Sequence, residues 1–122
     1  MIEQDLYNTL SGAASVMEIC ANRIYPVELP DECAMPAIEY KILSGPTQPT
    51  FSTGGISKLR VQIDCWGSTY ADAVNLRAAV IATLHMSRTA TFTGTLAARN
   101  DLFNHELLQY CARADFYILT SE

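Results

Sequence analysis

The sequence predicts an α+β domain in which two helices pack on one face of a mostly antiparallel sheet, in the order α-β-β-α-β-β. Three observations predict it: segments in which apolar and polar residues alternate, segments with apolar residues at the helical period, and short connections between successive strands. Short connections favour antiparallel neighbours. The 122 residues suit one domain, residues 1–122, with a single hydrophobic core.

The first helix is expected from Ile2 to about Ile19, where Leu6 and Leu10 lie on one apolar stripe. Acidic residues occupy its first turn, which the helix dipole favours. Gly12 weakens the middle, since an internal glycine costs about 1 kcal/mol relative to alanine. A break into two pieces at this glycine is therefore one outcome that the sequence allows.

An irregular connector is expected next, because Pro26, Pro30 and Pro36 cannot continue a helix and keep the chain extended. Ile24 and Tyr25 form an apolar pair in this otherwise polar segment. We expect these two side chains to anchor the connector on the core.

Two strands follow, separated by a long loop. Residues Ala37 to Leu43 and Lys58 to Trp66 both alternate between apolar and polar side chains, as half-buried strands do. The loop from Ser44 to Ser57 is rich in glycine, proline, serine and threonine, and it is longer than a tight hairpin needs.

The second helix is expected to begin after Ser68 or Thr69, with Asp72 completing the cap, and to run to about His85. Its apolar stripe is expected to include Tyr70, and its small alanines allow close packing.

The last two strands are expected at Thr89 to Leu96, where threonines alternate with apolar residues, and at Leu108 to Ile118. Asn100 to Asn104 is expected to form the turn between them. In the last strand Cys111 falls among the polar positions.

Composition excludes several classes of function. Thirteen acidic and eight basic residues give a net charge of −5, which disfavours a broad nucleic-acid-binding surface. The uncharged stretches are too short to span a bilayer, so no membrane partner is expected. The acidic start lacks the pattern of a secretory signal, so we expect the chain to stay in the cytoplasm with its four cysteines reduced.

No motif indicates catalytic chemistry, and we expect no catalytic residue, cofactor or metal. His85 and His105 have no ligand spacing around them, and Gly54 and Gly55 lie between two strands and not before a helix. Asp31 and Glu32 could serve as acid and base, although a solvated loop edge explains them more simply. Cys65 is expected to fill the core, whereas Cys33 and Cys111 are expected to be the more reactive thiols.

The chain resembles the tail-completion family of tailed bacteriophages, the small tail-terminator or tail-to-head joining proteins. The resemblance rests on the opening helix, the alanine-rich helix and four passages: Arg23-Ile24-Tyr25-Pro26, Pro30 through Met35-Pro36-Ala37-Ile38-Glu39-Tyr40, Val61 to Thr69, and Tyr110 to Leu119. It implies an α+β virion protein that forms a ring, expected to be a homohexamer, at the head-proximal end of the tail. There it would cap the tail tube protein and join it to the head-tail connector protein after assembly in the host bacterial cytoplasm.

The resemblance also makes surface residues candidates for interfaces. The candidates for contacts between subunits are Arg60, Gln62, Arg77 and Arg113 on the expected strands and helix. The Ser44 to Ser57 loop, with Thr47, Gln48, Phe51 and Thr53, is expected to project toward the tube or the connector and to become ordered on docking. Each could equally be a solvated side chain or part of a local salt bridge. Deleting residues 47 to 54 is expected to spare folding and abolish assembly.

Six copies at −5 each would carry −30, and such a ring would let DNA pass through its lumen without specific binding. Other hypotheses for the function stay open: a head-side connector or another minor tail protein of the same fold, or a small soluble enzyme. An enzyme would require a polar pocket with clustered titratable groups.

Overall fold

The computed structural model describes residues 2–30, 32–43, 57–85, 92–106 and 108–120. Within these residues the fold is α+β, as predicted, but it has three helices and a mixed sheet of five strands. The elements in chain order are α1 (Ile2–Ser11), α2 (Ala14–Cys20), β1 (Ile24–Pro26), β2 (Ala37–Ile42), β3 (Ser57–Gly67), α3 (Tyr70–Leu84), β4 (Phe92–Asn104) and β5 (Gln109–Thr120).

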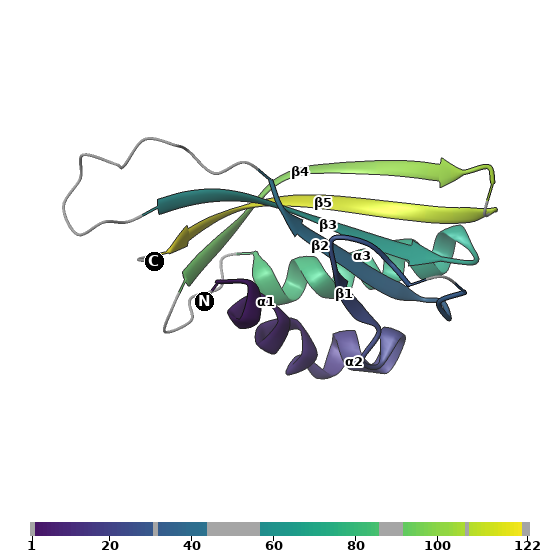
Figure 1. Ribbon diagram of the computed structural model, residues 1–122, viewed down its shortest axis with the longest axis horizontal. Coiled ribbons are helices and arrows are strands. Elements are labelled where there is room, and N and C mark those ends of the chain that lie inside the picture. The colour runs from purple at the N-terminus through teal and green to yellow at the C-terminus, as the bar shows by residue number, and fades with distance from the viewer. Residues whose placement is uncertain (1, 31, 44–56, 86–91, 107, 121–122) are drawn as a thin grey trace.

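The strands lie in the order β1-β2-β3-β5-β4, so the short β1 and the long β4 form the two edges of the sheet. β1 runs parallel to β2, and every other pairing is antiparallel. All three helices cover one face, and no helix formed by the described residues lies on the opposite face (Figure 1). This second face is called the open face below.

The predicted N-terminal helix is broken into α1 and α2, which confirms the weakness expected at Gly12. The Gly12 N–H still donates to the Asn8 carbonyl at 2.9 Å, but Ala13 has an extended backbone at φ −87° and ψ 118°. The break lets α1 bury Leu6 and Leu10 while α2 turns to bury Val16 on the same core.

The prediction of an irregular connector was wrong at Ile24–Pro26, which forms β1. Its pairing with β2 is extended by two bonds at 2.8 Å, from the Ile38 N–H to the Arg23 carbonyl and from the Val27 N–H to the Tyr40 carbonyl. Ile24 is buried, as expected, and Tyr25 is half-buried. A strand of three residues is too short to show a periodic pattern in the sequence. Its extended pairing depends on β2, which lies 14 residues further along the chain.

β2 and β3 follow the predicted alternation closely. On β3, Val61, Ile63 and Cys65 are buried and contribute to the core, while Arg60 and Asp64 point to the open face.

α3 begins as predicted, since the Thr69 hydroxyl accepts a hydrogen bond from the Asp72 N–H at 3.1 Å. Gly67 allows the close approach of strand and helix, because a Cβ there would lie 2.8 Å from the Ala73 nitrogen. Tyr70 was wrongly predicted to lie on the apolar stripe, since it is 50% exposed and the buried residues of α3 begin at Ala73.

The turn predicted at Asn100–Asn104 was wrong, because β4 continues through these residues and the chain reverses only after Asn104. A β-bulge between Leu96 and Ala98 shifts the register with β5. The predicted strand start at Thr89 lies outside the described residues.

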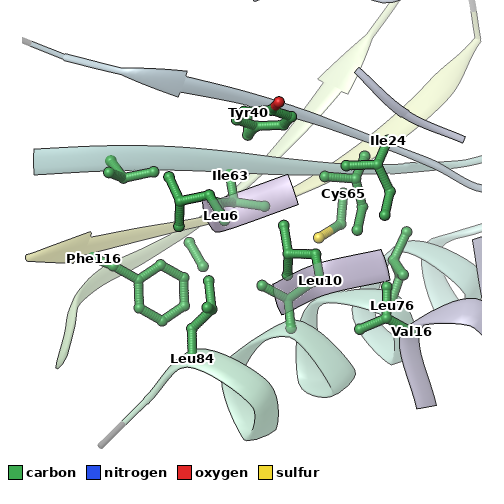
Figure 2. Packing of buried hydrophobic residues seen from close by; sticks show 14 of the residues in the cluster. Leu6, Leu10, Val16, Ile24, Tyr40, Ile63, Cys65, Leu76, Leu84 and Phe116 are labelled. Carbon is green, nitrogen blue, oxygen red and sulfur yellow. The ribbon is translucent and has the colours of Figure 1, made fainter. Parts of the chain in front are cut away.

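The core lies between the helices and the sheet. Leu6 and Leu10 of α1 and Leu84 of α3 point toward the strands, where they meet side chains such as Ile63 and Phe116 (Figure 2). All five of these side chains are fully buried. Burial of apolar area on this one face is the main force that holds the layers together.

Candidate interaction surface

The open face is built from the polar positions of the two longest central strands. Because side chains alternate along a strand, Arg60, Gln62 and Asp64 of β3 lie beside Arg113 and Asp115 of β5. Each of the two strands therefore supplies arginine and aspartate to the same surface.

The centre of the open face is an ion pair between Asp64 and Arg113. The Arg113 Nε donates to Asp64 Oδ1 at 2.7 Å, and its Nη2 donates to Oδ2 at 3.3 Å. Gln62 Nε2 also donates to Asp64 Oδ2, at 3.2 Å. The hydrogen bond to Asp64 is the main cause of the raised pKa of Arg113. Only 3% of the Asp64 side chain is exposed, so these hydrogen bonds offset the cost of burying a polar group there.

A second ion pair lies toward the other end of the strands. The Arg60 Nη2 donates to Asp115 Oδ2 at 2.9 Å, and 39% of the Arg60 side chain is exposed. The Lys58 ammonium lies 4.2 Å from the centre of the Tyr117 ring, and the Arg60 guanidinium lies 5.6 Å from it. Both distances allow a cation–π contact.

The predicted residues fall into three groups. Arg60, Gln62 and Arg113 are brought together on the open face, as the strand alternation implied, although Gln62 is only 8% exposed. Arg77 does not join them, because it lies between α3 and β4 and pairs with Asp101. The loop candidates Thr47, Gln48, Phe51 and Thr53 lie outside the described residues.

Arg77 belongs to a separate cluster at the edge of the sheet. Asp101 accepts hydrogen bonds from the Tyr70 hydroxyl, at 2.7 Å, and from Arg77, and these two bonds lower the pKa of its carboxyl. The Tyr110 ring contacts two other rings: its centroid lies 5.9 Å from that of Tyr70 and 4.8 Å from that of Phe103. This cluster fastens the far half of β4 to the start of α3.

The expectation that Cys111 would be reactive was wrong, because its side chain is only 2% exposed under the open face. Burial, aided by the nearby Asp64 carboxylate, raises the pKa of the Cys111 thiol. Cys65 fills the core as predicted, and burial raises its pKa as well. Cys33 is half-buried.

A cleft of about 350 Å³ lies at one end of the open face. The segment after β1 forms one wall, where the Leu29 N–H donates to Glu39 Oε2 at 3.1 Å. Desolvation is the main cause of the raised pKa of the Glu39 carboxyl. The cleft is lined by Glu28, Leu29, Pro30, Glu32, Cys33, Met35, Glu39, Trp66, Asn104 and Gln109.

Two polar atoms in the walls of this cleft, Trp66 Nε1 and Gln109 Oε1, are buried and form no hydrogen bond within the described residues. Glu39, Asp64 and Trp66 were not predicted from the sequence as site residues. Their positions could have indicated them, since all three alternate with the buried apolar residues of the predicted strands and so lie on the open face.

Among the described residues, no group of three or more histidine, cysteine or acidic side chains could hold a metal ion. The His85 Nδ1 accepts a hydrogen bond from the Leu96 N–H at 2.9 Å, and His105 contacts the Phe103 ring. Glu32 is exposed, and its proposed partner Asp31 lies outside the described residues. No helix in the described part of the chain is long and apolar enough to cross a bilayer.

Comparison with known proteins adds two findings. The sequence model of the family described as tail completion protein gp17 matches residues 4–115. A solved structure described as the virion of a native gene transfer agent particle contains a chain with the same fold, at a TM-score of 0.74 and 15% identity, covering 94% of this chain and 90% of that one. No curated protein matches the chain in sequence.

Proposed function

The chain belongs to the tail completion protein gp17 family and is thus a structural tail protein, and on that premise we propose that it forms a ring, a homohexamer, at the head-proximal end of a phage-like tail. There it ends the tail tube and joins the tube to the head connector. The match over residues 4–115 carries this proposal, since it covers nearly the whole domain.

The distribution of charge supports a ring that surrounds DNA without binding it. The net charge of −5 on each copy repels phosphate, and the arginines at the centre of the open face are neutralised by aspartates of the same chain. Six copies would therefore surround passing DNA without binding it specifically.

The chemistry of the described thiols supports a protein without catalytic activity. A cysteine nucleophile acts as a thiolate, and burial raises the pKa values of Cys20, Cys65 and Cys111. These three side chains are suited to filling space and not to attacking a substrate.

The interface residues remain part of the proposal. The side chains of Arg60 and Arg113 stay 39% and 30% exposed while they are paired. Each guanidinium can therefore donate a further hydrogen bond to a neighbouring subunit. The loop residues 47 to 54 are proposed to contact the tube or the connector because of their composition and length.

Deleting the gene from a host that produces the particle tests the proposal. We expect separate heads and tails, with tubes of irregular length, in negative-stain images, and rescue by the gene on a plasmid. A tagged copy should be labelled by immunogold at the head-proximal end of the tail. Joined, normal particles without the protein would contradict the proposal.

The same host separates this role from that of a head-side connector. A tail terminator should co-purify with tail tubes when head assembly is blocked, whereas a connector should co-purify with portal complexes. In solution the hexamer would have a mass of about 80 kDa, six times the 13.4 kDa of one chain.

A further inference from the structure

The cleft beside Trp66 has the side chains of an arginine-binding site. Glu28 and Glu32 are exposed at its rim and Glu39 lies half-buried within it, and none of the three forms an ion pair within the described residues. Three carboxylates and an indole ring that line the same cleft favour a guanidinium, which pairs with carboxylates in a planar fork and stacks on indole.

Two side chains that line the cleft also carry a buried polar atom without a hydrogen bond, Trp66 Nε1 and Gln109 Oε1. Unmade hydrogen bonds at buried groups cost free energy in the isolated subunit. A docked segment that shifts these two side chains would supply partners, a guanidinium N–H for Gln109 Oε1 and a backbone carbonyl for Trp66 Nε1.

The chain itself offers a matching arginine farther along β4, away from the cleft. Arg99 is exposed on the edge strand β4, lines two shallow hollows there and forms no ion pair with any described residue. It lies five residues before Asn104, which lines the cleft, and this spacing is about 16 Å along an extended strand. The distance exceeds the reach of the arginine side chain, so Arg99 and the cleft are two separate surfaces.

We propose that the cleft beside Trp66 binds Arg99 of a second copy of this chain. The contact joins two different surfaces, and such head-to-tail contacts form a ring when the rotation closes. The inference rests on the proposed self-assembly and goes beyond it, because it names the two sides of the subunit contact and the ion pair that gives it direction.

Complementary charge reversal tests the contact. Arg99→Glu and the double variant Glu28→Arg/Glu32→Arg each place like charges on both sides of the contact, so each alone should self-associate at least tenfold more weakly than the wild type. An equimolar mixture of the two should recover assembly, because every contact between unlike copies is again between opposite charges. Sedimentation or light scattering measures the association, and circular dichroism checks that each variant is folded.

The control is Glu18→Arg, which reverses a charge on the exposed surface of α2 and should assemble like the wild type. Assembly of either variant alone at wild-type strength would overturn the inference, as would a mixture that does not assemble or a wild type that stays monomeric.

Particle production reports separately on the proposed function. If Arg99→Glu supports joined particles, the subunit contact is assigned wrongly while the role in the tail stands. If the charge-reversed pair assembles as expected but the protein is absent from particles, the contact stands and the proposed function fails.

Discussion

On the helix-covered face of the sheet, Ile63 and Phe116 lie against apolar side chains, whereas on the open face Asp64 and Asp115 each bind an arginine of the adjacent strand. The apolar face tolerates small shifts because hydrophobic packing has no direction. The open face does not, because a slip of one residue between β3 and β5 would bring apolar side chains to this face and break both ion pairs. The helix-covered face holds the helices against the sheet, and the open face fixes the register between β3 and β5.

The largest effect is expected from truncating the covered face. Phe116→Ala should lower the free energy of unfolding by about 3–5 kcal/mol, through lost burial and the cavity left behind. Leu119→Ala, three residues along β5 and 45% exposed, should change it by less than about 0.5 kcal/mol. Denaturant titration followed by circular dichroism measures both, and equal losses would break the contrast between the faces.

A smaller effect is expected on the open face. Asp64→Asn should cost about 1.5–3 kcal/mol, because it removes the charge that accepts from Arg113 in a site where the carboxylate is 3% exposed. The matched variant Asp115→Asn should cost about 0–1 kcal/mol, since water reaches the 39% exposed side chain of Arg60. If both substitutions cost the same, burial does not decide the strength of these pairs.

The smallest effect is expected at Glu39, and it depends on pH. The folded state raises the pKa of this carboxyl mainly by desolvation, so its ionisation opposes folding. That cost is absent below the ordinary glutamate pKa, grows as the pH rises through the raised value and is complete above it. Glu39→Gln, which keeps an oxygen to accept from the Leu29 N–H, should therefore stabilise the protein at pH 7.

The measurement for Glu39→Gln is the difference in unfolding free energy between variant and wild type at pH 7 and at pH 3.5. The difference should shrink at the lower pH. A gain that stays constant across this range would show that the carboxylate is not the cause.

The sequence predicted those elements whose information is local. On β3 every second side chain faces the core, and on α3 five of the fifteen residues are buried at helical spacings. These two elements could therefore be identified from the sequence without any partner. β1 was missed because three residues carry no pattern and pair with a distant strand. The end of β4 was missed because Asn100 and Asn104 are typical turn residues, and only pairing with β5 keeps them extended.

The surface was predicted less completely for the same reason. Arg60 and Arg113 were singled out by type, but their aspartate partners come from the other strand and could be paired only once the register was known. Cys111 was assigned correctly to the open face, yet its burial depends on neighbours from several elements.

The bulge in β4 bears on how far copies of this chain can associate. An uninterrupted edge strand of this length could form backbone hydrogen bonds with a strand of another copy. Copies added in this way could continue to add without limit. The extra residue between Leu96 and Ala98 bends the edge and divides it, so backbone pairing cannot run along its full length. Contacts in the proposed ring would therefore depend on side chains of defined position, as a closed assembly requires and an open fibre does not.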